Sequence, residues 1–282
     1  MLTQEALAEL AQVSVRTIRN LEAGRNSSAT TRRLIASALS SVLPEPSPAP
    51  AATVPAQLMP DIPAFAGRLE ELRALDRHLA ADTGNPATKI FLLAGVAGSG
   101  KTALAVHWAH RVRRHFPDGQ LFVDLHGNGP GPTRPPEDVL GGLLRALGPR
   151  TELPPTLDER AARYRTLVAG RRMLILLDDA ASDEQVRPLL PGTASGLVVV
   201  TSRHRLAGLV ARHGARRVPV RPLPLEAAVG LLRALIGERV DGDPEAAAAL
   251  AGLCGRMPLV LRHVAEILSA DPTLPLRRLE LG

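Results

Sequence analysis

Cysteine, lysine and long apolar runs are nearly absent from this sequence. Cys254 is the single cysteine among 282 residues, so an intrachain disulfide is excluded and an oxidising compartment is not implied. We find neither a signal peptide nor an apolar run of about 18 residues, the length that a bilayer-spanning helix needs. The apolar stretches 174–177 and 197–200 are far shorter. We therefore expect a cytoplasmic protein with no membrane partner.

Nearly all basic residues are arginine, and lysine occurs only at Lys89 and Lys101. The formal net charge is +6, and the isoelectric point is about 10.7. This balance favours polyanionic partners such as nucleic acid or nucleotide phosphates, although a solvated basic surface explains it equally well. With 45% hydrophobic and 22% charged residues, the composition is that of a soluble globular protein.

Proline divides the chain into segments. Residues 43–63 contain seven prolines, mostly among small and polar residues, which cannot form a packed core. We expect a semi-extended linker there that reaches roughly 60 Å. Before the linker, residues 1–42 have a helical pattern. After it, residues 64–222 alternate short apolar runs with amphipathic stretches, and residues 223–282 have helical patterns only.

The alternation in residues 64–222 predicts a series of βα units. Unbroken apolar runs suit a parallel sheet that helices cover on both faces. The last segment is expected to be a small helical domain. The predicted strands are 90–94, 120–125, 173–177, 197–201 and 217–220; the helices between them are 102–114, 136–147, 157–168 and 183–189, and those of the last domain are 225–236, 244–253 and 259–268.

A glycine-rich loop follows the first predicted strand. Residues 95–102 read GVAGSGKT and fit the pattern GxxxxGK[ST], with a strand before it and a helix after it. Such a loop turns successive backbone N–H groups toward an anion, and the helix N-terminus adds partial positive charge. We predict ATP or ADP with Mg²⁺ as the cofactor, with Lys101 on the β- and γ-phosphates and Thr102 on the metal. The predicted phosphate-binding residues are Gly95, Gly98, Ser99, Gly100, Lys101 and Thr102.

Two carboxylates end the third predicted strand. Residues 172–179 read RMLILLDD, which is similar to a Walker B motif. Asp178 is expected to hold Mg²⁺ directly or through water, and Asp179 to orient or deprotonate the attacking water. The alternative makes the pair a helix N-cap, since aspartate caps helices well. The phosphate loop upstream favours the metal role.

The fourth predicted strand ends in polar residues. Residues 197–203 read LVVVTSR, and Arg203 is placed to contact the γ-phosphate and so to distinguish ATP from ADP. The alternative is an ordinary surface arginine after a strand. The predicted catalytic residues are therefore Asp178, Asp179 and Arg203.

These motifs, in this order, resemble the NB-ARC module of the signal-transducing (STAND) NTPases, which are close to the AAA+ ATPases. Residues 65–72, FAGRLEEL, look like the FxGRxxEL motif that lies beside the adenine in this family. The resemblance implies nucleotide contacts for Phe65, Gly67 and Arg68. Residues 253–259, LCGRMPL, look like the GLPL motif, whose proline, here Pro258, packs on the base.

The resemblance also implies a switch. In the family, ADP between the α/β and helical domains keeps the protein closed, exchange for ATP opens it and often drives oligomerisation, and slow hydrolysis resets it. The family continues into a winged-helix domain and sensor repeats, which do not follow Gly282. We therefore expect a fragment, a truncated gene product or a protein that relies on a partner.

Residues 3–25 have a helix-turn-helix pattern similar to the phage-repressor (XRE) domains. Thr3 and Ser14 are expected to cap two helices that share an apolar face. Gln12 replaces the family's turn glycine, and the family's first helix would precede Met1, so we expect the true start upstream. The alternative is a helical hairpin that binds protein. The resemblance implies base contacts from Val15, Arg16, Thr17 and Asn20 and phosphate contacts from Gln4 and Arg19.

The sequence thus predicts an α/β P-loop NTPase fold with a parallel five-stranded sheet, a small C-terminal helical domain and an all-α N-terminal helix-turn-helix. We expect a nucleotide-controlled, DNA-binding transcriptional regulator with slow ATPase activity and nucleotide-dependent self-association. One alternative is a signalling or defence scaffold whose N-terminal helices bind a protein. A metabolic P-loop kinase fits less well, because it leaves the motifs at Phe65 and Pro258 unexplained.

Overall fold

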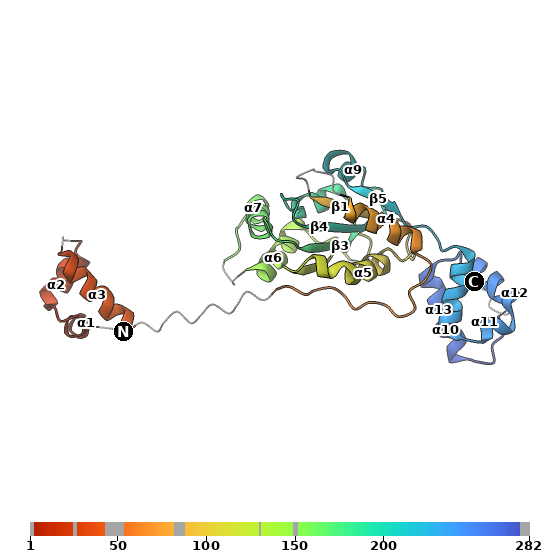
Figure 1. The fold of residues 1–282 in the computed structure, drawn as a ribbon, viewed down its shortest axis with the longest axis horizontal. Helices are drawn as coiled ribbons and strands as arrows, with labels where there is room; N and C mark the ends of the chain where they lie inside the picture. Colours follow the sequence, from red (N-terminus) through yellow and green to blue (C-terminus); the bar gives the residue numbers. More distant parts are fainter. Residues whose placement is uncertain are drawn as a thin grey trace. The chain divides into compact units, whose positions relative to one another are not determined.

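The computed structural model describes residues 3–24, 27–42, 54–81, 88–129, 131–148 and 152–276. The chain divides into two compact units, Met1–Thr53 and Val54–Gly282 (Figure 1). Every helix in the described ranges is too short or too polar to cross a lipid bilayer.

The N-terminal unit contains three helices, α1 (Gln4–Leu10), α2 (Val15–Glu22) and α3 (Ala29–Val42). The Thr3 hydroxyl accepts a hydrogen bond from the N–H of Ala6, and the Ser14 hydroxyl accepts one from the N–H of Thr17. Both predicted caps are therefore confirmed. The three helices bury mostly small side chains, namely Ala8, Ala11, Ile18 and Ala38.

The second unit is built on a five-stranded parallel sheet. Its strands are β1 (Lys89–Ala94), β2 (Gln120–Asp124), β3 (Leu174–Ala180), β4 (Leu197–Ser202) and β5 (Arg216–Pro219), in the order β2-β3-β4-β1-β5. All four neighbouring pairs are parallel, which confirms the predicted sheet. Strand β4 therefore lies between the strand that leads into the phosphate loop and the strand that carries the two aspartates.

Alternate residues of the strands pack into two separate hydrophobic cores, one on each face of the sheet. Phe91 and Leu93 of β1 pack with α4 (Leu69–Ala80) and α5 (Lys101–Val112). Ile90 and Leu92 pack on the opposite face. That face is covered by α6 (Pro136–Leu147), α7 (Leu157–Val168), α8 (Asp183–Val186) and α9 (Ala207–His213), with a short 3₁₀ turn at Arg187–Leu189. A second 3₁₀ turn, Arg113–His115, directly follows α5.

A third core belongs to the C-terminal helices. These are α10 (Leu225–Ile236), α11 (Arg239–Gly242), α12 (Pro244–Leu253) and α13 (Pro258–Ala270). Leu232, Leu250 and Leu261 are among the side chains that they bury together. The three predicted helices are confirmed, and α11 is an additional single turn. Residues 277–282 of the predicted domain lie outside the described residues.

The second half of the predicted linker lies on the α/β domain. Gln120 of the edge strand β2 donates its N–H to the carbonyl of Pro55 (2.7 Å) and accepts from the N–H of Gln57 (2.9 Å). Farther along, the carbonyl of Met59 lies 2.8 Å from Nε2 of His110 on α5. Edge strands offer unpaired backbone groups, and an extended proline-rich segment can satisfy some of them. Residues 54–63 are thus part of the second unit, and residues 43–53 lie outside the described residues.

Candidate nucleotide site

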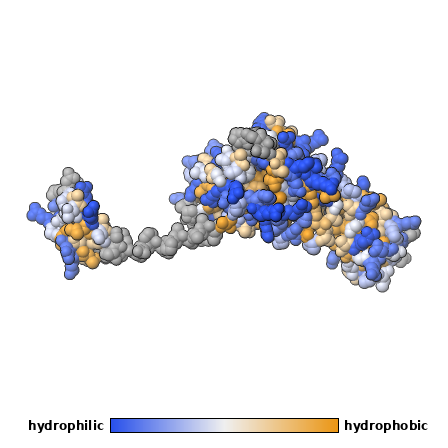
Figure 2. Space-filling view, viewed as in Figure 1, coloured by the Kyte–Doolittle hydropathy of each residue, from blue (hydrophilic) through white to orange (hydrophobic). Residues whose placement is uncertain are grey.

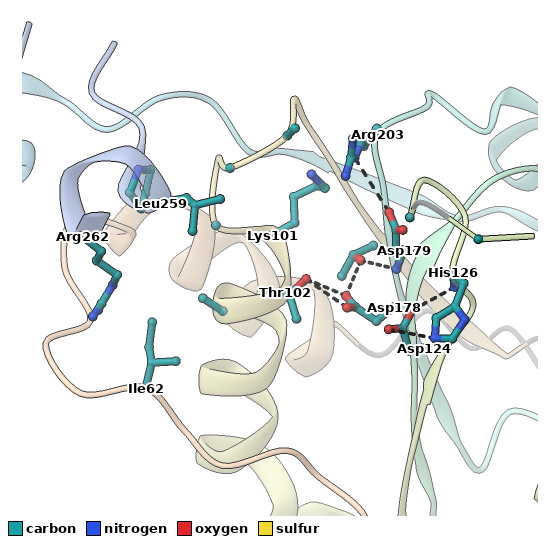
Figure 3. Close-up of a pocket in the computed structure, with 18 of the residues that line it drawn as sticks. Ile62, Lys101, Thr102, Asp124, His126, Asp178, Asp179, Arg203, Leu259 and Arg262 are labelled. Atoms are coloured by element: carbon teal, nitrogen blue, oxygen red, sulfur yellow. Dashed lines mark hydrogen bonds and ion pairs between the residues drawn. The ribbon is translucent and has the colours of Figure 1, made fainter. Parts of the chain in front are cut away.

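The phosphate loop joins β1 to α5 at the carboxyl end of the sheet (Figure 3). Gly98 and Gly100 have φ values of 72° and 89°. Gly100 is also the N-cap of α5, and its left-handed backbone would strain any residue with a side chain. The loop therefore curls over the start of α5, as a phosphate cradle requires.

Lys101 lies at the start of α5 and points into a large cavity beside the phosphate loop (Figure 3). Its ammonium donates to the carbonyl of Val96 (2.9 Å), and the residue is only 8% exposed. Burial lowers the pKa of Lys101, and Arg203 adds to this effect, whereas Asp179 and Asp178 oppose it. A buried cation with one neutral carbonyl partner is well placed to bind an anionic phosphate.

Asp178 and Thr102 meet across the gap between β3 and α5. The Thr102 hydroxyl lies 2.8 Å from Oδ1 and 3.0 Å from Oδ2 of Asp178. The hydroxyl of Thr201 on β4 also donates to Asp178. Burial raises the pKa of Asp178; the two hydroxyls oppose this shift, while the charges of Asp124 and Asp179 add to it.

These groups fit a magnesium ion chemically. A buried carboxylate and a threonine hydroxyl in contact are hard oxygen donors of the kind that Mg²⁺ prefers, and Mg²⁺ usually takes its other ligands from water and phosphate. In the described ranges no group of three or more His, Cys, Asp or Glu side chains is arranged to hold a metal by itself. A site completed by phosphate oxygens is consistent with that finding.

Asp179 adopts an unusual backbone conformation beside Asp178. Its φ is 50°, within a β-bulge of β3. Its carboxylate accepts two hydrogen bonds from Asn128, and Nε of Arg203 lies 4.0 Å from Oδ1. The N-cap of α8 is Ser182, so the alternative of an aspartate cap for this pair is wrong.

The helical domain closes one side of the site. A cavity of about 860 Å³ lies between the phosphate loop, the ends of β2 to β4 and the N-terminal turn of α13. Pro258 and Leu259 line it, and the N–H of Leu259 donates to the carbonyl of Gly98 (3.3 Å). The predicted Pro258 therefore lies beside the phosphate loop.

Phe65 and Gly67 lie outside this large cavity. Phe65 lines an adjoining cavity of about 20 Å³ and stacks on His107, with ring centroids 4.0 Å apart. A Cβ on Gly67 would lie 2.3 Å from Cβ of Ala227 on α10. Gly67 thus permits close packing of the helical domain, and it is not among the described residues that line the larger cavity.

Arg68 bonds to the backbone of the phosphate loop. It is 3% exposed, its guanidinium donates to the carbonyl of Ser99 (2.6 Å), and it pairs with Glu71 (2.8 Å). The Ser99 hydroxyl is buried and has no hydrogen-bond partner. Arg68 therefore acts on the loop backbone. Gly95, the remaining predicted residue, follows β1 and packs against the carbonyl of Val220.

The structure adds four residues that the sequence did not single out. Thr201 stood in the quoted strand motif, where a buried hydroxyl next to the aspartate strand was a usable signal. Asn128, Ile62 and Arg262 gave no such signal, because their positions depend on how distant loops pack. Arg262 lines the cavity and donates to the carbonyls of Pro63 (2.7 Å) and Ala64 (2.9 Å).

In the N-terminal unit, Gln12 occupies the turn between α1 and α2 with a φ of 52°. It thus adopts the conformation that a glycine usually supplies. Gln4 links the helices by accepting from Nε of Arg19 (3.1 Å) and donating to Glu22. Arg16 is exposed on α2. The predicted DNA contacts Val15, Arg16, Thr17, Asn20, Gln4 and Arg19 all lie on α1 or α2.

Comparison with known proteins gives matches to the N-terminal residues and to most of the chain. Residues 1–42 match the helix-turn-helix family HTH_3. The regulatory protein AfsR of Streptomyces griseus is 47% identical over 231 residues, which are 81% of this chain and 23% of that protein. AfsR of Streptomyces coelicolor is 45% identical over 225 residues, 78% of this chain and 22% of that protein. The chain spans under a quarter of either regulator.

Among solved structures, a STAND protein with a tetratricopeptide repeat sensor from Pyrococcus horikoshii is 23% identical, with a TM-score of 0.49 over 77% of this chain and 32% of that one. The Aeropyrum pernix ORC1 protein in complex with DNA is 20% identical, with a TM-score of 0.48 over 75% of this chain and 62% of that one. The chain thus has a segment that matches a helix-turn-helix family before a domain with a five-stranded parallel sheet, and most of it is related in sequence to part of the AfsR regulators.

Proposed function

We propose that the chain is a nucleotide-controlled switch of the NB-ARC, STAND type that regulates transcription through its helix-turn-helix. The observation that carries the nucleotide part is the contact between Thr102 and Asp178 beneath a glycine-rich loop that also presents Lys101. Three motifs that are far apart in the sequence converge there on one cavity. ATP or ADP with Mg²⁺ is the ligand that needs this combination of groups.

The switch would distinguish ATP from ADP by the negative charge of the γ-phosphate. Lys101 and Arg203 both line the cavity, as does Asp179, whose carboxylate lies 4.0 Å from Nε of Arg203 (Figure 3). A third phosphate adds negative charge and oxygen ligands that ADP lacks. A ligand shifts a conformational equilibrium only by its differential affinity for the two states, and Arg203, half-exposed near Asp179, is the group that supplies this difference in the proposal.

The helical domain would transmit the nucleotide-dependent conformational change from the site to the segment before residue 65. Leu259 bonds to the phosphate loop, and Arg262 holds the carbonyls of Pro63 and Ala64. The same helix α13 therefore touches both the loop and the end of the proline-rich segment. Movement of α13 would alter how the segment before residue 65 is held, which gives a route toward the N-terminal unit.

The DNA part rests on the N-terminal unit. A helix-turn-helix places its second helix in the major groove, and α2 presents Arg16 and Arg19 as exposed cations. The AfsR proteins are named as regulatory proteins, which agrees with such a role. We propose that this chain works in the cytoplasm, hydrolyses ATP slowly and forms nucleotide-dependent oligomers.

Two measurements test the proposal. Denaturing the purified full chain should release about one ADP or ATP per molecule, identified by chromatography. Footprinting on genomic fragments should show specific protection whose midpoint differs between Mg·ATP and Mg·ADP. A chain that carries no nucleotide and binds neither nucleotide in calorimetry would contradict the switch. Protection that is identical with both nucleotides would remove the nucleotide control.

A protein-binding role for the N-terminal unit is the second candidate. Leu10 is 50% exposed and Leu34 is 45% exposed, and Figure 2 shows apolar residues at the surface of this unit. Exposed leucines of this kind suit a partner protein as well as a second copy of the chain. Salt-dependent binding to duplex DNA favours the first proposal, and its absence would favour this one.

A further inference from the structure

The loop after β2 is fixed along the end of β3 by four hydrogen bonds. The N–H of Leu125 donates to the carbonyl of Asp178 (2.8 Å), and the N–H of Gly127 donates to the carbonyl of Asp179 (2.7 Å). Asn128 then donates its own N–H to Oδ2 of Asp179 and its side-chain Nδ2 to Oδ1, both at 2.9 Å. Asn128 thus holds both carboxylate oxygens of one residue.

The backbone on both sides of this contact has local features that allow the close approach of Asn128 to Asp179. Asp179 has a φ of 50°, and its own N–H donates to the hydroxyl of Thr201 (2.9 Å) in place of the regular strand pairing. A Cβ on Gly127 would lie 2.2 Å from the carbonyl oxygen of Asp179, so glycine is required where the loop crosses the bulge. A strained residue held by its surroundings often marks a functional site.

The fixed carboxylate faces the nucleotide cavity. Asp179, Lys101 and Arg203 all line that cavity, whereas Asn128 approaches Asp179 from the loop after β2. A carboxylate has about four lone-pair sites, and Asn128 uses two of them. The other acceptor sites stay available to a water molecule in the cavity.

From this geometry, and resting on the proposed ATPase switch, we infer that Asn128 is a positioning residue for hydrolysis. It orients the Asp179 carboxylate, which in turn orients the attacking water beside the terminal phosphate. Asn128 does not itself line the cavity among the described residues, so it acts through Asp179. A displacement of about 1 Å of such a group costs up to roughly 100-fold in rate.

Steady-state hydrolysis of Mg·ATP by the full chain, together with calorimetric titration of ATP, tests this inference. Asn128→Ala should lower kcat by roughly 10- to 100-fold, while KM and the calorimetric affinity for ATP change by no more than about twofold. A role in folding alone would not give this separation of kcat from binding. Gly142→Ala on α6 is the control, because its added Cβ would meet nothing within 4 Å and Gly142 does not line the cavity, and it should keep the wild-type rate.

A double variant shows whether Asn128 acts through Asp179. If it does, Asn128→Ala combined with Asp179→Asn should be no slower than Asp179→Asn alone. Additive losses in the double variant, or a wild-type rate for Asn128→Ala, would overturn the inference and leave nucleotide binding intact. So would the absence of any hydrolysis by a wild-type chain that binds ATP. A wild-type chain that binds no nucleotide would instead overturn the proposed function beneath it.

Discussion

The Thr102 hydroxyl lies 2.8 Å from Oδ1 of Asp178, although 76 positions separate the two residues in the sequence. The contact joins the first turn of α5 to the end of β3. Strand β4 lies between β3 and β1, the strand that precedes α5. In nucleotide-binding sites of this fold a metal ion sits where a hydroxyl and a carboxylate converge beside the phosphates. This contact therefore marks the proposed position of Mg²⁺.

Replacing Asp178 should stabilise the protein while weakening its use of magnesium. Burial raises the pKa of Asp178, so the folded state favours the protonated form. A carboxyl with a raised pKa supports folding below its ordinary pKa, and this support is lost as pH rises through the raised value. Without nucleotide, Asp178→Asn should therefore have a higher Tm than wild type at about pH 7, with the difference shrinking as pH falls toward about 4.

Thermal unfolding between these pH values checks the sign. A Tm difference that grows on acidification would show that the ionised carboxylate stabilises the fold. Calorimetry with Mg·ADP and with ADP in EDTA supplies the second readout. Magnesium should improve ADP affinity in wild type and have little effect in Asp178→Asn.

Arg203→Ala should weaken ATP binding selectively. The guanidinium lines the cavity and lies 4.0 Å from Asp179, so it can turn toward a terminal phosphate. We expect ATP affinity to fall by roughly tenfold, equivalent to about 1.4 kcal/mol, while ADP affinity changes less than about twofold. Arg205→Ala, two positions on, is exposed and serves as the control. An equal loss for both nucleotides would make Arg203 a general electrostatic contributor.

Gly127→Ala should destabilise the second unit because the new Cβ has no room. It would lie 2.2 Å from the carbonyl oxygen of Asp179 and 2.5 Å from the nitrogen of Ala181. Overpacking of this kind costs about 1–3 kcal/mol, which urea unfolding can measure. Gly129→Ala, with nothing within 4 Å, should stay within about 0.5 kcal/mol of wild type. Equal stability of the two variants would refute the close approach of this loop to β3.

Arg16→Ala should reduce specific DNA binding by about 1–3 kcal/mol with a smaller effect on random DNA. Arg16 is exposed near the start of α2, the end that base-reading helices insert into the major groove. Arg19→Ala is the comparison, since a phosphate contact should weaken both kinds of binding and reduce the salt dependence. If Arg16→Ala weakens both equally, Arg16 is a phosphate contact.

Local patterns were sufficient to predict the sheet and the curled glycine-rich loop between β1 and α5. All five strands were predicted from apolar runs, and GVAGSGKT has one dominant structural meaning after a strand and before a helix. The helices α4 and α9 were not among the predicted ones, and the single turn α11 has too few residues to show a period. Residues 54–63 were predicted as part of a semi-extended linker because proline content does not reveal that β2 has an open edge.

The roles around the phosphate loop were harder to predict than its position. The nucleotide contacts that the resemblance implies for Phe65 and Arg68 stay predictions; the structure shows Arg68 bonded to the backbone of Ser99 and Phe65 stacked on His107. Asn128 was not predicted at all, since its contact with Asp179 depends on a bulge that arises only when the strands pair. Tertiary contacts of this kind have no periodic signature in the sequence.

The chain's two lysines offer the most direct test of the nucleotide site. Lys101 points into the cavity, whereas Lys89 bonds to the carbonyls of Leu79 and Ala81 at the opposite end of β1. In calorimetric titrations with Mg·ADP and Mg·ATP, Lys101→Ala should lose at least about 100-fold in affinity, and Lys89→Gln should bind like wild type. Unchanged affinity in Lys101→Ala would contradict the assignment of residues 95–102 as the phosphate site.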